Sequence, residues 1–441
     1  MSHLEPVCGE GHSLLPMPPG TYFGLVGNLR PCKAGLTSAM LRRYELINER
    51  FADSADNRRM TLLTLSGRDK DDVESYSLTD GVDVLNVERH GNRVKSECAW
   101  IDWLAELSAI ATAEDPVYFI CDGHEVGAVV VESLRPLPHV FFIQVVHNPT
   151  RSAKYADFRR SAEYADAIVC ATNRQAKALI SDERHGGKAH GKVPVYDIGF
   201  PRRSAGAKQT ERNERRIIML TRVHWQKDIS LAVESFHELM RLAESSGLEG
   251  RSDLVLDIYG ALEDAGEVAR SKVAIDSYNL QGKVKLHGYT SGAFEELGSS
   301  SITWLTSRFE GWGLAITEAQ QSGCIPVVVD EPFGPREQIE HGKDGFLVRS
   351  HAARWLRHQE DKKKPGRKVR AMRKVGRRVI TSLPVQVARE TLRVLEMDAM
   401  HREDIRLASI ERVGTAQRSP ETYIDNWIDV IEKVGSQARR V

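Results

Sequence analysis

The sequence is poor in several features that define large protein classes. It has only six cysteines among 441 residues, and none of them forms a C-x-x-C pair. This scarcity favours a reduced cytoplasmic compartment over a secreted, disulfide-stabilised fold. No apolar run reaches the roughly 18 residues that a membrane-spanning helix needs. Residues 1–20 contain acids and prolines without an apolar centre, unlike a secretory signal. We therefore expect a cytoplasmic protein.

Signatures of other ligand-binding classes are missing as well. Neither G-x-G-x-x-G nor G-x-x-x-x-G-K-[ST] occurs, which argues against NAD-dependent enzymes and P-loop NTPases. Basic and acidic residues are balanced at 61 each, so no nucleic-acid partner is expected. No cluster of histidine and aspartate with metal-ligand spacing is apparent, and no metal site is predicted.

What is present indicates two α/β domains. A chain of 441 residues fits two domains of about 200 residues each. Short apolar runs alternate with helix-length segments, as in parallel sheets with crossover helices. Predicted strands lie at residues 22–26, 60–65, 82–87, 117–120, 140–146, 168–171 and 193–198, and then at 217–220, 254–259, 284–287, 302–305, 325–329 and 346–348. Helical patterns between them include residues 36–51, 100–111 and 229–240.

The polar stretch at residues 202–216 divides these two series and is the predicted interdomain linker. The predicted domains are residues 1–201 and residues 217–420, each a doubly wound, Rossmann-like unit. Ligands of such sheets bind at the carboxyl ends of the strands. Arg222 and Lys227 follow the strand at 217–220, where a planar fork and a point charge suit an anionic ligand. They could also be ordinary surface charges.

The most informative loop follows the predicted strand at 302–305. It contains Glu310 and Glu318, with Gly311 and Gly313 between them. A glycine-bearing loop between a strand and a helix makes an anion site, because the first helical N–H groups lack internal partners. We expect Glu318 to open this helix. The two carboxylates would bind sugar hydroxyls, since they repel phosphate. Solvated glutamates in an ordinary α/β loop are the alternative.

Glu310 and Glu318 resemble the E-x7-E signature of retaining glycosyltransferases of the GT-B fold, family 4. Residues 333–348 (FGPREQIEHGKDGFLV) are similar to the next sequence block of that family. The match runs in order through residues 217–348 and is looser in the first half. The resemblance implies two Rossmann-like domains facing across a cleft. It also implies that the C-terminal helix, residues 421–441, packs back onto the N-terminal, acceptor-side domain.

The resemblance implies a nucleotide-sugar donor, with a UDP-sugar expected. Arg222 and Lys227 would bind its pyrophosphate, Glu318 its ribose hydroxyls, and Glu310 would face the transferred sugar. His147, which ends an apolar strand, would lie near the C6 hydroxyl and the reacting bond, although a histidine there can be structural. The remaining candidates are the donor contacts Gly313, Leu314, Ala315, Gly35 and Tyr289, and the acceptor contacts Asn148, Arg151 and Lys154. Ala34 replaces a glycine that is frequent in the family, which weakens the expected phosphate contact of the Gly35 loop.

The implied chemistry is transfer with retention of the anomeric configuration. The closely flanking carboxylates of a double displacement are not apparent. A front-face substitution is the mechanism that the resemblance implies. In it, the leaving phosphate helps to deprotonate the acceptor. Arg222 and Lys227 would take the place of a divalent ion, and no cofactor is expected.

The acceptor is expected to be a hydroxyl of a cell-surface glycan or polymer. A similarity to members that glucosylate poly(glycerol phosphate) teichoic acid lies in residues 35–37, in Asn148, and in residues 333–335 with Glu337 and Ile339. Residues 362–378 carry ten basic and no acidic side chains within the 360–380 insertion. This region could be a solvated surface, or could bind anionic lipid at the inner face of the membrane or a polyanionic acceptor. A GT-B epimerase, a phosphorylase and a non-catalytic nucleotide-sugar-binding or scaffold protein remain alternatives.

Overall fold

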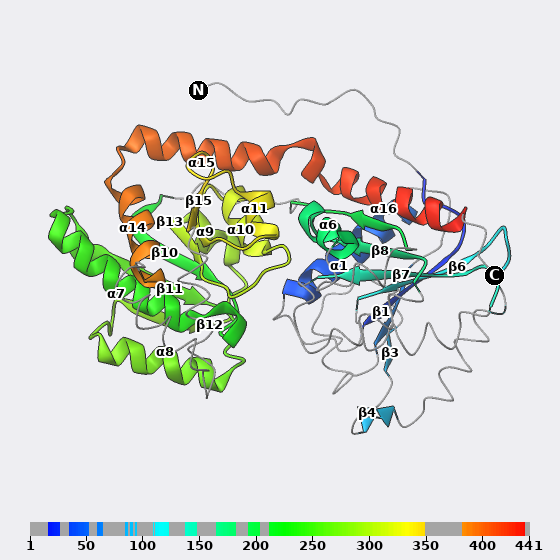
Figure 1. The fold of residues 1–441 in the computed structure, drawn as a ribbon, viewed down its shortest axis with the longest axis horizontal. Coiled ribbons are helices and arrows are strands. Elements are labelled where there is room, and N and C mark those ends of the chain that lie inside the picture. Colours follow the sequence, from blue (N-terminus) through cyan, green and yellow to red (C-terminus); the bar gives the residue numbers. More distant parts are fainter. Residues whose placement is uncertain are drawn as a thin grey trace.

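The computed structural model has two α/β halves, with the last helices running along both of them (Figure 1). It describes residues 16–26, 35–52, 60–64, 84–86, 89–90, 93–94, 109, 111–122, 137–147, 165–181, 193–202, 211–348 and 382–436. The predicted α/β architecture is confirmed: each half is built on one parallel sheet. The helix predicted at 100–111 lies almost entirely outside the described residues.

The N-terminal half contains a seven-stranded sheet with the strand order β3-β2-β1-β6-β7-β8-β9. A two-stranded antiparallel pair, β4–β5, lies outside it. Strands β6, β7 and β8 are buried along their whole length, as expected for parallel strands covered on both faces. The strands are β1 (Thr21–Val26), β2 (Thr61–Thr64), β3 (Val84–Asn86), β4 (Arg89–His90), β5 (Arg93–Val94), β6 (Val117–Cys121), β7 (Val140–Val146), β8 (Ala167–Cys170) and β9 (Val195–Asp197).

Three described helices of eight residues or more cover this sheet: α1 (Gly35–Ala52), α6 (Asn173–Ser181) and α16 (Pro420–Gly435). Helices α1 and α16 share one hydrophobic core with β1, β6 and β7, into which α16 inserts Tyr423, Trp427 and Ile431. Helix α6 packs on β7 and β8 in a separate cluster through Ala176 and Leu179. Helix α16 therefore completes the hydrophobic core of the N-terminal half.

The C-terminal half contains a six-stranded sheet with the order β12-β11-β10-β13-β14-β15. Its strands are β10 (Asn213–Leu220), β11 (Val255–Tyr259), β12 (Val284–Gly288), β13 (Ser300–Leu305), β14 (Ile325–Val329) and β15 (Phe346–Val348). Its helices are α7 (Ile229–Ser246), α8 (Ala265–Ser277), α9 (Ala293–Gly298), α10 (Leu314–Gln321), α11 (Gly334–Gln338), α14 (Leu383–Glu396) and α15 (Ala399–Gly414). Short 3-10 turns are η2 (Trp225–Lys227), η3 (Arg251–Asp253) and η4 (Ala416–Arg418).

Alternating side chains of β10 separate the two helix layers of this half. Ile217 and Met219 lie in the large core that contains α7 and α14, whereas Ile218 lies in a smaller cluster with α9 and α10. Strand β10 begins at Asn213, ahead of the predicted start at 217. The polar residues at its start are compatible with a strand because Glu214 pairs with Arg406 and Arg216 pairs with Asp257. Hydrophobic pattern alone could not reveal that compensation.

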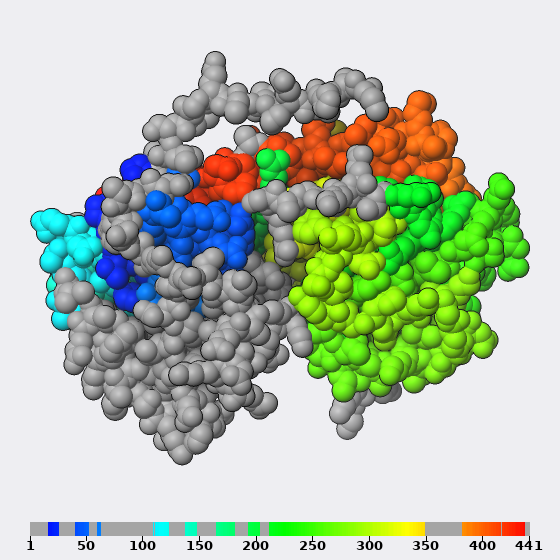
Figure 2. Space-filling model, turned by 180° about the vertical axis from the view of Figure 1, so that it is seen from behind, coloured from blue at the N-terminus to red at the C-terminus, as the bar shows by residue number. Residues whose placement is uncertain are grey.

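Helices α15 and α16 connect the halves, and the orange and red segments extend across both in either view (Figures 1 and 2). Helix α15 packs on α10 and α16 on α1. The Arg43 guanidinium lies over the Trp427 ring at 4.9 Å, and Arg50 forms an ion pair with Asp425 at 3.1 Å. None of the described helices has the length and apolar character needed to cross a membrane.

Replacing Trp427 with alanine should detach α16 from the N-terminal core. The side chain is 1% exposed, and loss of a buried tryptophan typically costs about 3–5 kcal/mol. We expect a large shift of the urea unfolding transition to lower denaturant concentration. Leu407→Ala on α15, where the side chain is 55% exposed, is the control and should change stability by less than about 0.5 kcal/mol. Equal shifts for both variants would contradict the packing described here.

Candidate functional site

The segment that runs from β13 into α10 carries both predicted glutamates, Glu310 in the loop and Glu318 in the helix. Gly313 has a φ of 91°, which favours glycine, and α10 begins directly after it at Leu314. No side chain caps this helix, so its first N–H groups point out of the helix end. The prediction that Glu318 opens the helix is wrong. Glu318 lies one turn inside α10, because the left-handed glycine starts the helix earlier.

Glu310 forms a direct ion pair with Lys227. The side chains are 7% and 15% exposed, so the pair is largely shielded from water. The backbone brings them together: Arg308 N donates to the Gln226 carbonyl at 2.8 Å. The Gln226 amide in turn donates to the Phe309 carbonyl at 3.0 Å. The 3-10 turn after β10 is thereby fixed to the loop after β13, the strand beside it in the sheet.

Arg222 lies in the same loop as Lys227 but has another partner. Its guanidinium donates to Glu263 at 2.7 Å. Burial and the neighbouring Arg222 charge lower the pKa of His224, and Lys227 also contributes. The neutral His224 ring accepts a hydrogen bond from Gln226 N at 3.1 Å. Both cations therefore lie within electrostatic reach of one imidazole.

His147 ends β7 and contacts a buried acid that the sequence analysis missed. Its Nε2 lies 2.6 Å from Asp122 Oδ1, and the other oxygen of Asp122 pairs with Arg43. Burial alone would raise the pKa of Asp122, but the Arg43 charge and the His147 hydrogen bond lower it below its usual value. An ionised carboxylate only accepts hydrogen bonds, so the His147 proton resides on Nε2.

Two aromatic residues bring His147 and the Glu310 loop together across the halves. The Phe200 ring stacks near His147 with centroids 6.2 Å apart. The same ring meets Trp312 edge-on at 6.0 Å. Trp312 lies in the loop between Glu310 and Gly313. Of the predicted residues, His147 and the loop that contains Glu310 therefore lie near the same point of the interface.

The remaining predicted residues are placed less fully. Gly35 is the first residue of α1. Tyr289 directly follows β12 and is 56% exposed, so it is available for a ligand. Asn148, Arg151 and Lys154 lie outside the described residues, as does the basic region at 362–378.

Three residues of this region escaped the sequence analysis: Arg43, Asp122 and Glu263. Asp122 had a usable signal, because it directly follows an apolar strand just as His147 does. Arg43 had none, since it is one of several basic residues on α1. Glu263 follows β11 by a few residues, but its pairing with Arg222 depends on how two loops meet.

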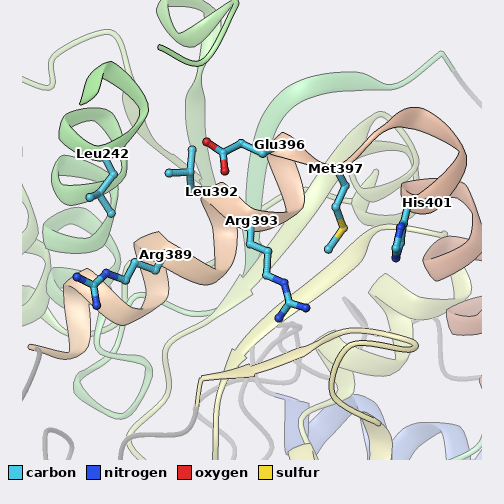
Figure 3. Close-up of a pocket in the computed structure, with 7 residues that line it drawn as sticks. All are labelled: Leu242, Arg389, Leu392, Arg393, Glu396, Met397 and His401. Carbon is cyan, nitrogen blue, oxygen red and sulfur yellow. The ribbon is translucent and has the colours of Figure 1, made fainter. Parts of the chain in front are cut away.

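A separate surface pocket lies away from this region, between α7 and α14 (Figure 3). Figure 3 shows that it collects side chains of mixed character, namely Leu242, Arg389, Leu392, Arg393, Glu396, Met397 and His401. None of them belongs to the predicted site. Within the described residues, no group of three or more histidine, cysteine, aspartate or glutamate side chains is arranged to hold a metal ion.

Comparison with known proteins matches one family to part of this chain. The family described as "Glycosyl transferases group 1" matches residues 202–372, a segment that contains Arg222, Lys227, Glu310 and Glu318. This part of the chain belongs to that family. The resemblance predicted from the E-x7-E spacing is confirmed.

Curated relatives of this family match over limited segments. The poly(glycerol-phosphate) alpha-glucosyltransferase of Bacillus subtilis is 29% identical over 134 residues, covering 30% of this chain and 18% of that protein. The poly(ribitol-phosphate) alpha-N-acetylglucosaminyltransferase of Staphylococcus aureus is 34% identical over 94 residues, covering 21% of this chain and 18% of that protein. The matches thus span about a fifth of either relative.

Solved structures extend the likeness to the whole fold. The pneumococcal O-GlcNAc transferase GtfA, in complex with UDP and GlcNAc, superposes with a TM-score of 0.69 at 13% identity, over 95% of this chain and 100% of that one. A point mutant of S. aureus TarM, in complex with Fondaparinux, alpha-GlcNAc-glycerol and UDP, gives 0.68 at 13% identity, over 95% and 100%. The expected GT-B fold is therefore confirmed.

Replacing Asp122 with asparagine should leave the buried Arg43 charge without a counter-charge. Breaking such a buried pair costs about 3–5 kcal/mol at neutral pH. Despite its burial, the pKa of Asp122 is lowered in the folded state by the Arg43 charge and the His147 hydrogen bond. Its stabilisation is therefore present above the usual aspartate pKa and is lost as the pH falls through the folded-state pKa.

Urea unfolding between about pH 3 and pH 7 should therefore show a stability difference that narrows in acid. Asp404→Asn, at an exposed position of α15, should change stability little at any pH. A difference between wild type and Asp122→Asn that widened in acid would contradict the assigned charge state.

Proposed function

We propose that the protein is a retaining glycosyltransferase that moves a hexose from a nucleotide-sugar, with UDP as the expected nucleotide, to a hydroxyl of a cell-surface glycan or polymer. The observation that carries the proposal is the contact between Lys227 and Glu310, with Arg222 in the same loop. A cationic side chain and a carboxylate are thus available to one diphosphate-linked sugar.

The two cations suit the leaving group. As the bond between the anomeric carbon and the phosphate oxygen breaks, negative charge grows on the diphosphate. Arg222 and Lys227 would stabilise that charge. The open N–H groups of Leu314 and Ala315, after Gly313, suit the distal phosphate.

The carboxylates suit the sugars of the donor. Glu318, one turn inside α10, would accept hydrogen bonds from the ribose hydroxyls. Glu310 would face the transferred hexose, where it can bind hydroxyls and support positive charge at the reacting carbon. Tyr289, exposed after β12, would approach the base.

The first half would contribute His147, held by Asp122. A fixed imidazole at the end of β7 can bind a hexose hydroxyl in a single orientation. In a front-face substitution, the acceptor oxygen bonds to the anomeric carbon on the side that the diphosphate leaves. The acceptor proton passes to the leaving phosphate oxygen, so the products are a glycoside and a nucleoside diphosphate.

The acceptor is proposed from chemistry and relatives together. Two curated relatives are named for polyol-phosphate polymers, which are polyanions, and residues 362–378 of this chain are strongly basic. We propose a polyanionic polymer acceptor contacted by this region and by Asn148, Arg151 and Lys154. The basic region would also allow peripheral contact with an anionic membrane surface.

Incubation with UDP-glucose in the absence of acceptor tests the activity. Slow release of UDP is expected, because water can replace the missing acceptor. A non-catalytic binding protein would instead be stabilised against heat by UDP, and it would release no UDP from UDP-glucose. A thermal-shift screen of nucleotide-sugars identifies the donor if another base or sugar is preferred.

Arg222→Ala and Lys227→Ala should each lower turnover by roughly ten- to a hundredfold, the effect of one lost charge-assisted contact. Lys227→Ala should also lose some stability, because the shielded Glu310 carboxylate then lacks its counter-charge, so turnover is compared on protein shown to be folded. Arg241→Ala on α7, whose side chain is 54% exposed, is the matched control and should keep full turnover. Wild-type turnover in both site variants would refute the assignment.

Transfer should persist in excess chelator, because Arg222 and Lys227 supply the positive charge that a divalent ion would otherwise provide. The measurement compares initial rates before and after treatment with EDTA. Complete loss of activity that magnesium restores would show that the two cations are insufficient.

A further inference from the structure

Arg222, proposed to bind the donor diphosphate, already has a carboxylate partner in the structure. Its guanidinium donates to Glu263 Oε2 at 2.7 Å, and the two side chains are 22% and 16% exposed. A phosphate and a carboxylate use the same geometry on a guanidinium. The donor diphosphate must therefore replace Glu263 or share Arg222 with it.

The backbone holds Glu263 in this place. The loops after β10 and β11 run side by side: Thr221 N donates to the Tyr259 carbonyl and Val223 N to the Ala261 carbonyl, each at 2.8 Å. Asp264 N then donates to the Val223 carbonyl at 3.0 Å. The bonded residues include both chain neighbours of Arg222 and the residue after Glu263. The alignment of the two loops therefore places Arg222 and Glu263 next to each other.

Gly260 allows the two loops to approach. Its φ is 150°, and a Cβ at this position would lie 2.0 Å from the Thr221 carbonyl oxygen. A side chain here would separate the loops and the ion pair with them. Asp264 adds a further tie, since its side chain accepts from Trp225 N at 3.1 Å and so connects the loop after β11 to η2.

The Arg222–Glu263 ion pair reduces the positive charge of the proposed diphosphate site. Lys227 is paired with Glu310, and Arg222 with Glu263, so these four side chains have no net charge. A site lined by unpaired cations would bind any diphosphate tightly, including the nucleoside diphosphate product. A transferase that held its product tightly would turn over slowly, since product release limits many enzymes.

We infer that Glu263 is an internal competitor for the diphosphate site. It pairs with Arg222 when the site is empty, yields to the donor diphosphate, and returns as the nucleoside diphosphate leaves. It thereby lowers the affinity for the diphosphate and speeds its release. This inference rests on the proposed function, because it requires a diphosphate at Arg222.

Binding of UDP to the full chain, measured by calorimetry, tests the inference with Glu263→Gln. This change removes the competing charge and keeps the size of the side chain. We expect UDP to bind about two- to fivefold more tightly, the range for releasing a partly exposed ion pair. Uridine, which has no phosphate, should bind the variant and the wild type equally. Glu244→Gln, at an exposed position of α7, is the matched control and should not change UDP affinity.

A double-variant cycle identifies the route of the effect. In the Arg222→Ala background, Glu263→Gln should no longer tighten UDP binding, because Glu263 acts through Arg222. Unchanged or weaker UDP binding by Glu263→Gln, in a protein whose UDP binding depends on Arg222, would overturn the inference alone. If the wild type did not bind UDP, or if Arg222→Ala bound it normally, the proposed donor site itself would fail, and the inference with it.

Discussion

Parallel strand pairing is the constraint on which both halves of this protein depend. All strands of a parallel sheet end at the same edge, so the loops that follow them meet there. In the C-terminal half, the loops after β10, β11 and β13 meet in this way, although they are far apart in sequence. The ion pairs of Lys227 with Glu310 and of Arg222 with Glu263 are direct consequences of that arrangement.

The second constraint is the return of α16 to the N-terminal core. Trp427 of α16 contacts Arg43, Arg43 pairs with Asp122, and Asp122 holds His147. The orientation of a candidate catalytic side chain therefore depends on a helix at the other end of the chain. Buried charges of this kind are costly unless all are paired, which ties this network to correct docking of the helix.

An aromatic contact joins the two halves beside the candidate site. Phe200, just after β9, packs against both His147 and Trp312. Trp312 lies in the loop that carries Glu310, so the aromatic contact links the N-terminal candidate to the C-terminal ones. Arg418, at the end of η4, lies over the same indole ring at 5.1 Å. Trp312, in the loop of Glu310, therefore also contacts the segment that leads into α16.

Much of this could be predicted from the sequence. Apolar runs of strand length determined the parallel strands, and the spacing of Glu310 and Glu318 indicated the family, because both are local patterns. Tertiary structure alone decided the partners of the charged groups. Arg43 and Asp122 are 79 residues apart, and Arg50 and Asp425 are 375 apart. A charged residue reads the same in sequence whether it is solvated or buried in a pair. Folding determines whether the charge is solvated or paired, because it excludes water from some side chains and brings distant residues into contact.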